Sequence, residues 1–171
     1  EYETSGDPTE TAIIHAGLGL NLNKNDLEKQ FPRVEEVPFD SERKRMATIN
    51  RMEGGRLRVN VKGGLDEMLG VTTRILINGK ERPITQEDRD AIEKENSRMA
   101  LSALRVLAVG YRYIDAVPSP ANATTVEKDL VFTGLLGMID QARAQVMGAV
   151  IKCQTAGFGP RMVTGHHRVT A

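Results

Sequence analysis

An aromatic side chain stands beside a run of cations in the first third of the chain. Phe39 is followed by Arg43, Lys44 and Arg45, and aromatic residues make up only 4% of the sequence. An aromatic ring can stack on a nucleobase while nearby cations neutralise phosphates. The pattern therefore favours a nucleotide as the ligand, and its alternative is an ordinary β-hairpin with solvated charges.

Two further cations could contact the same kind of ligand. Lys62 ends an alternating apolar segment and precedes Gly63 and Gly64, which leave a ligand room to approach the ammonium group and the backbone. Arg105 lies where a helical pattern passes into an apolar strand, and a guanidinium buried there requires a carboxylate or phosphate partner. The alternatives for these positions are an ordinary exit from a strand and a surface arginine.

Other common catalytic and metal-binding patterns are absent from the sequence. Neither the phosphate loop G-x-x-x-x-G-K-S/T nor a G-x-G-x-x-G motif after a strand occurs. The three histidines and the single cysteine, Cys153, lack the spacing of a metal site. Asp88-Arg89-Asp90 resembles the D-x-D motif of haloacid-dehalogenase-type phosphatases, but it falls in the first turn of a polar helix. We therefore expect no metal site in this chain, and none of these motifs supplies a catalytic residue.

The composition limits the partners and the location of the chain. Its 171 residues are 40% hydrophobic and 27% charged, and 23 basic residues offset 23 acidic ones. A net charge of zero favours neither nucleic acid nor anionic lipid as a partner. The longest uncharged apolar stretch, residues 130–139, is much shorter than the roughly 20 residues of a membrane-spanning helix. Because the sequence has neither an initiator methionine nor a signal peptide, we expect a soluble, cytosolic piece of a larger protein, without direct membrane insertion.

The elements that would position these residues form an α+β domain. Asp7-Pro8-Thr9-Glu10 predicts a helix start in which Glu10 completes a capping box. The other expected elements are a helix over residues 26–30, an edge strand over 34–39, a hairpin of strands over 45–52 and 57–62, a hairpin strand over 74–77 that turns at Asn78-Gly79, a helix over 85–104 and a strand over 106–109. The hairpins predict an antiparallel sheet flanked by helices.

A change of pattern over residues 116–125 predicts a domain boundary. This segment contains Pro118, Pro120 and small polar residues, as a loop does. After it we expect a β-α-β unit made of a strand over 130–139, a helix over 142–156 and a strand over 161–164. The predicted organisation is an antiparallel domain in residues 1–125 and a truncated α/β segment in residues 126–171.

Six ordered segments resemble those of one protein family. Residues 6–10 resemble G-D/E-x-T-E, residues 39–46 resemble F-x-S-x-R-K-x-M, residues 61–66 resemble V-K-G-A-P-E, residues 104–108 resemble L-R-x-L-A, residues 137–143 resemble G-x-x-D-P-P-R and residues 162–167 resemble M-x-T-G-D-x. These motifs belong to the nucleotide-binding domain, and to the following part of the haloacid-dehalogenase-like phosphorylation domain, of the P-type cation-transporting ATPases. The second and third segments are similar to those of the calcium pumps.

The resemblance implies that ATP is the ligand and that its adenine stacks on Phe39. The residues that it implies around the nucleotide are Glu10, Phe39, Ser41, Arg43, Lys44, Lys62, Gly63, Arg105, Thr164 and Gly165. Arg105 would reach toward the phosphates, and Thr164 and Gly165 would lie near the γ-phosphate in the closed state. In the parent protein, Mg²⁺ would accompany the nucleotide.

The family's reaction needs parts that this chain lacks. As the family implies, the parent transfers the γ-phosphate of ATP to an aspartate and drives a cation, here calcium, across a membrane. The D-K-T-G-T motif with that aspartate is absent, so we expect this chain to bind ATP without turnover. Its partners would be the remaining phosphorylation, actuator and transmembrane domains, and it would lie at the cytoplasmic face of the membrane.

Two departures from the family pattern keep an alternative open. Asp140 and Arg143 would form the hinge between the domains, but the family's two prolines between them are missing. His166 stands where the family has an aspartate near the phosphate. The alternative function is a degenerate, pump-derived interaction module that no longer binds nucleotide.

Overall fold

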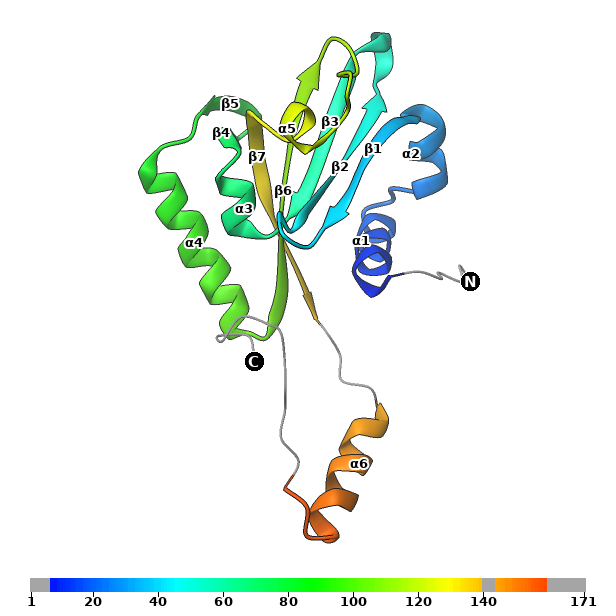
Figure 1. The fold of residues 1–171 in the computed structure, drawn as a ribbon, viewed down its shortest axis with the longest axis vertical. Helices are drawn as coiled ribbons and strands as arrows, with labels where there is room; N and C mark the ends of the chain where they lie inside the picture. Colours follow the sequence, from blue (N-terminus) through cyan, green and yellow to red (C-terminus); the bar gives the residue numbers. More distant parts are fainter. Residues whose placement is uncertain (1–6, 140–143, 160–171) are drawn as a thin grey trace.

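The described part of the chain is built around one sheet of seven strands (Figure 1). The computed structural model describes residues 7–139 and 144–159. In space the strands follow the order β1-β2-β3-β6-β7-β4-β5, and every neighbouring pair is antiparallel except β4 and β7. The α+β class predicted from the hairpins is confirmed.

Most predicted strands and helices are present, but the strand predicted over residues 106–109 is longer, and two short helices, Leu65–Leu69 and Ala123–Val126, were not predicted. The strands are β1 (Arg33–Asp40), β2 (Arg45–Arg51), β3 (Leu57–Gly63), β4 (Thr72–Ile77), β5 (Lys80–Pro83), β6 (Leu104–Ile114) and β7 (Leu130–Ile139). The α-helices are α1 (Pro8–Gly19), α2 (Lys24–Gln30), α3 (Leu65–Leu69), α4 (Gln86–Leu101), α5 (Ala123–Val126) and α6 (Ala144–Thr155). Both predicted hairpins are present as β2–β3 and β4–β5, and β1 is an edge strand, as its proline predicted.

Successive residues of β3 alternate between two environments, because neighbouring side chains of a strand point to opposite faces. Leu57, Val59 and Val61 are buried in the hydrophobic core, whereas Arg58 and Asn60 border a cavity with residues of α1 and α2. The core face is covered by α3, α4 and α5, which contribute Leu65, Met68, Leu69, Ile92 and Val126. Figure 1 shows α1 and α2 on one side of the sheet and α3 and α4 on the other.

The strand over residues 130–139 lies inside this sheet and does not open a second domain. It forms β7, which is antiparallel to β6 and parallel to β4. The predicted boundary after residue 125 is therefore wrong for this strand. The proline-containing loop leads from β6 through α5 back to the same sheet. A loop of this composition is equally typical of a chain reversal within a domain and of a linker between domains, so the sequence did not distinguish the two.

The second half of the predicted α/β segment is described only in part. The expected helix is present as α6, and Gly157 follows it with a φ of 80°, a backbone conformation that favours glycine. The expected strand over residues 161–164 lies outside the described residues. A phosphorylation-domain segment after β7 stays a prediction.

The D-x-D sequence at the start of α4 has a structural role. Asp88 accepts a hydrogen bond from the backbone N–H of Thr85 at 2.9 Å and forms an ion pair with Arg82. Thr85 in turn accepts from the Asp88 backbone N–H, which completes a capping box. The phosphatase interpretation of this motif therefore receives no support, because its carboxylate is used to start a helix.

Tyr111 should ionise well above the usual pH for a tyrosine. Its ring is 8% exposed on β6, and its hydroxyl donates to Glu81 Oε1 at 2.6 Å. Burial and the Glu81 carboxylate raise the pKa of Tyr111 to about 12, from 10.0. The folded state favours the neutral phenol, so this group contributes about 2 kcal/mol to the free energy of unfolding below pH 10. That contribution is lost as the pH rises through 12.

A tyrosinate absorbance titration of the folded chain measures this shift. We expect one of the three tyrosines to titrate about two pH units above the usual value, and Tyr111→Phe to remove that late step. A single transition near the usual pKa, unchanged by the substitution, would contradict the assignment.

Candidate functional site

A cavity of about 440 Å³ lies between the start of α1 and the strands β1, β2, β3 and β6. Its lining consists of Asp7, Thr9, Glu10, Phe39, Met46, Lys62, Gly63, Arg105 and Leu107. The structure therefore brings five of the predicted residues together, although they are spread over almost a hundred positions of the sequence: Glu10, Phe39, Lys62, Gly63 and Arg105. A volume of this size is in the range of small-molecule sites.

Phe39 reaches this cavity because β1 contains an extra residue. Val37 pairs with Ala47, but Asp40 pairs with Arg45, so three steps along β1 match two steps along β2. A shift of one residue moves the following side chains to the opposite face of a sheet. Without it, Phe39 would share the core face of Val37. With it, Phe39 lines the cavity and is 63% exposed, so a ligand in the cavity can reach its side chain.

Lys62 and Glu10 form an ion pair across the cavity. Lys62 Nζ lies 2.8 Å from Glu10 Oε1, with the lysine side chain 26% exposed. The hydrogen bond and the positive charge of Lys62 lower the pKa of Glu10, so the pair is present at neutral pH and is lost on acidification. The predicted capping box at the start of α1 is therefore not formed by Glu10. Its carboxylate bonds to Lys62.

Gly63 is required by close packing between two backbones. It pairs with Arg45 of β2 on one side and with Ala108 of β6 on the other. A Cβ atom at this position would lie 2.6 Å from the Lys44 carbonyl oxygen and closer still to Arg45 Cβ. We predicted that Gly63 leaves room for a ligand. In the structure, the absence of a side chain at Gly63 allows the backbone at Lys44 and Arg45 to pack closely against β3.

Arg105 connects the first strand residues of β6 with the start of α1. Its Nη1 donates to Thr9 Oγ1 at 3.2 Å. Asp7 lies beside them and accepts from the Thr9 backbone N–H at 2.8 Å, and the hydrogen bonds from Thr9 lower the pKa of Asp7. The cavity therefore holds two carboxylates and two cations. Sequence reasoning had assigned Asp7 and Thr9 only to the helix start, and it missed Met46 and Leu107 because apolar strand residues give no functional signal.

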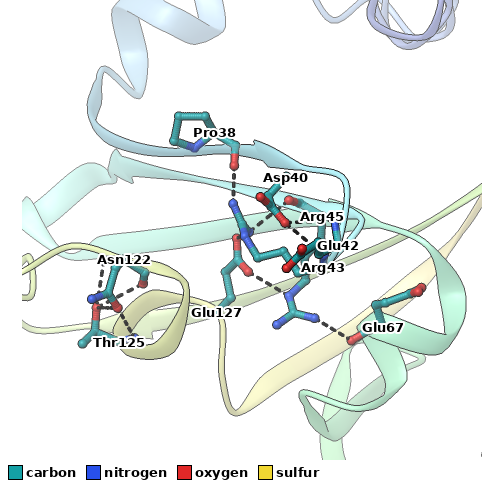
Figure 2. Close-up of polar contacts among 9 residues, drawn as sticks. All are labelled: Pro38, Asp40, Glu42, Arg43, Arg45, Glu67, Asn122, Thr125 and Glu127. Atoms are coloured by element: carbon teal, nitrogen blue, oxygen red, sulfur yellow. Dashed lines mark hydrogen bonds and ion pairs between the residues drawn. The ribbon is translucent and has the colours of Figure 1, made fainter.

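The other predicted residues of the β1–β2 turn do not line the cavity. Ser41, Arg43 and Lys44 are absent from its lining. Lys44 forms an ion pair with Glu67 at 2.9 Å, and Arg43 is bonded to the buried carboxylate of Glu127 (Figure 2). Their predicted contribution to the positive potential around a nucleotide therefore receives no support from their positions. The remaining predicted residues lie outside the described part of the chain: Asp140, Arg143, Thr164 and Gly165.

The described residues form a second cavity, but neither a cluster of metal-binding side chains nor a membrane-spanning helix. The second cavity, of about 490 Å³, lies between α1, α2 and the sheet and includes none of the predicted residues. Among residues 7–139 and 144–159, no cluster of three His, Cys, Asp or Glu side chains is arranged to hold a metal ion. Within the same ranges, no helix combines the length and the apolar character needed to cross a membrane.

Comparison with known families identifies the class to which this sheet and cavity belong. The family described as "P-type ATPase, cytoplasmic domain N" matches residues 1–145. The chain therefore belongs to the P-type ATPases.

Similar proteins include several calcium-transporting ATPases. Calcium-transporting ATPase 1 of Bacillus cereus is 38% identical over 98% of this chain and 18% of its own length. Calcium-transporting ATPase 1 of Lactococcus lactis is 36% identical over 100% of this chain and 19% of its own length. The cation-transporting ATPase pma1 of Synechocystis is 32% identical over 100% of this chain and 18% of its own length. The chain thus spans about a fifth of these relatives.

Proposed function

We propose that this chain is the ATP-binding cytoplasmic domain of an ATP-driven cation pump, with calcium as the transported ion. The observation that carries the proposal is the meeting of an exposed aromatic ring with two cations around one cavity, formed by Phe39, Lys62 and Arg105. The names of the relatives support calcium as the ion. The chain would present ATP to a phosphorylatable aspartate in another part of the pump and would not turn ATP over by itself.

Each cavity residue has a chemical task in this proposal. The Phe39 ring offers a face for the adenine, and Met46 and Leu107 supply apolar walls beside it. Lys62 can donate to an acceptor of the nucleotide once its bond to Glu10 is exchanged. Arg105 can form charge-assisted hydrogen bonds to phosphate oxygens. These contacts bind and orient the nucleotide, and the transfer step takes place outside this chain.

The described residues do not form a magnesium site. The carboxylates of the cavity are Asp7 and Glu10, and both already accept hydrogen bonds from protein groups. Mg²⁺ requires near-octahedral oxygen coordination and is commonly bound through phosphates and water. We therefore expect the affinity of this chain for ATP to depend little on Mg²⁺.

The expected affinity is low. One stacked base contributes about 1 to 3 kcal/mol, and one or two charge-assisted hydrogen bonds contribute about 1.5 to 3 kcal/mol each. After the cost of ordering the ligand, about 4 to 5 kcal/mol remains. This free energy corresponds to a dissociation constant near a millimolar.

An ATP titration followed by two-dimensional NMR tests the proposal. We expect saturable shifts at the cavity residues, and an affinity about tenfold lower in Lys62→Ala, because the variant loses a charge-assisted hydrogen bond. Lys24→Ala is the matched control, since Lys24 is an exposed lysine that pairs with Glu28 away from the cavity.

Unchanged spectra at tens of millimolar ATP would overturn the proposal. They would favour the alternative, a pump-derived interaction module without nucleotide binding. An equal loss of ATP affinity in Lys62→Ala and Lys24→Ala would show that ATP binding depends only on the overall charge of the domain.

A further inference from the structure

A buried carboxylate lies behind the β1–β2 turn. Glu127 follows α5, and its side chain is 0% exposed. It accepts hydrogen bonds from Arg43 Nη1 and, at 2.7 Å, from Arg45 Nε (Figure 2). A buried charge is tolerated when it is paired and hydrogen-bonded, and its removal leaves the partner charges uncompensated. Glu127 therefore fixes two guanidinium groups that come from a segment more than eighty residues earlier in the chain.

One of these guanidinium groups holds both arms of the turn. Arg43 Nη1 also donates to the Arg45 carbonyl oxygen at 3.0 Å, in β2, and Arg43 Nη2 donates to the Pro38 carbonyl oxygen, in β1. Asp40 closes the turn itself, since its carboxylate accepts from the backbone N–H groups of Glu42 and Arg43. Figure 2 shows Arg43 between the Pro38 carbonyl group and Glu127.

This clamp acts on the backbone next to Phe39. The Phe39 ring is 63% exposed, so packing alone holds it weakly. Its direction depends on the irregular pairing between Val37 and Asp40, and the carbonyl group bonded by Arg43 belongs to the residue just before Phe39. A planar guanidinium can hold several acceptors in fixed directions at once, which a lysine cannot do.

We propose that Glu127 is a positioning residue for the nucleotide base, acting through Arg43 on the irregular part of β1 that directs Phe39. This inference rests on the proposed function. Arg43 then has a different role from the predicted one. Its charge pairs with the buried Glu127 carboxylate, and its hydrogen bonds to the backbone on both sides of the turn hold Phe39 in position to stack on adenine.

The test compares a ligand with a base and a ligand without one. Glu127→Gln keeps the shape of the side chain and removes its charge. In the folded variant we expect the affinity for ATP to fall about fivefold, a part of the stacking energy, while the affinity for inorganic tripolyphosphate stays the same. In a Phe39→Ala background, Glu127→Gln should cause no further loss of ATP affinity. If Glu127→Gln does not fold, Arg43→Lys tests the same clamp, because it retains the charge and loses the fixed directions.

A readout without ligand separates this inference from the proposed function. With fluorine-labelled phenylalanine, the Phe39 resonance should shift or broaden in Glu127→Gln, while that of Phe158, which is 70% exposed after α6, should not. Unchanged ATP affinity and an unchanged Phe39 resonance in the folded variant would overturn the inference, and so would equal losses for ATP and tripolyphosphate. If the unaltered chain fails to bind ATP, the proposed function falls, and the Phe39 resonance still decides whether Glu127 positions the ring.

Discussion

Phe39→Ala is expected to weaken ATP binding by about tenfold or more and to leave the free energy of unfolding nearly unchanged. Loss of a stacked base costs about 1 to 3 kcal/mol, and 1.4 kcal/mol corresponds to a factor of ten in affinity. The fold should tolerate the change because the ring is 63% exposed and lies outside the hydrophobic core. Isothermal urea unfolding and the NMR titration measure the two quantities separately.

Phe158→Ala is the matched control for this change. Phe158 is 70% exposed and does not line the cavity, so its removal deletes the same kind of surface ring. Equal ATP affinities in the two variants would mean that the base does not stack on Phe39. A lower affinity in Phe39→Ala with unchanged stability would assign the effect to the cavity.

Gly63→Ala is expected to have the largest effect on stability, a loss of about 3 kcal/mol in the free energy of unfolding. The added methyl group would meet the Lys44 carbonyl oxygen at 2.6 Å and the Arg45 Cα at 2.9 Å. Arg45 Cα belongs to the β2 backbone that pairs with Gly63, and the Lys44 carbonyl oxygen, just before β2, accepts a hydrogen bond from the Gly64 N–H at 2.9 Å. Neither atom can move without disturbing the start of the ladder between β2 and β3. The midpoint of urea unfolding measures the loss, provided that the slope of the transition is unchanged.

Gly64→Ala provides the comparison at the next position. There the added methyl group would meet the Glu67 carboxylate at 2.5 Å, the end of a flexible side chain, and alanine also occupies this place in the family motif. We expect a change of less than about 0.5 kcal/mol. If both variants lost the same stability, close packing of the two backbones at Gly63 would not be the cause.

The local elements could be predicted because their signals are local. The hairpin β2–β3 follows from alternating apolar residues, the turn of β4–β5 from Asn78-Gly79, and the start of α4 from Thr85 and its reciprocal cap with Asp88. The place of β7 could not be predicted. Its pattern of apolar residues is the same whether it opens a new sheet or completes an existing one, and only its pairing with β6 and β4 distinguishes the two.

The site was predictable in its residue types and only partly in its geometry. Phe39 and Lys62 could be selected as an aromatic residue among cations and a lysine before glycines. Arg43 has the same chemistry as a ligand-binding arginine, but its partner, Glu127, is 84 positions away. The direction of Phe39 depends on one extra residue in β1. Such long-range pairs and irregular registers depend on tertiary structure, so a sequence pattern alone does not contain them.

The position of β7 has a consequence for the order in which the domain folds. The hairpin β4–β5 joins the other strands only through β7 within the described sheet, and Thr72 of β4 pairs with Leu130 of β7. During synthesis, β1, β2, β3 and β6 can pair before β7 leaves the ribosome, and until then β6 presents an open edge. Pairing between distant segments is slow, and open edges favour association with other chains. Folding of the described sheet is therefore completed by β7, which joins two parts of the sheet that do not pair with each other directly.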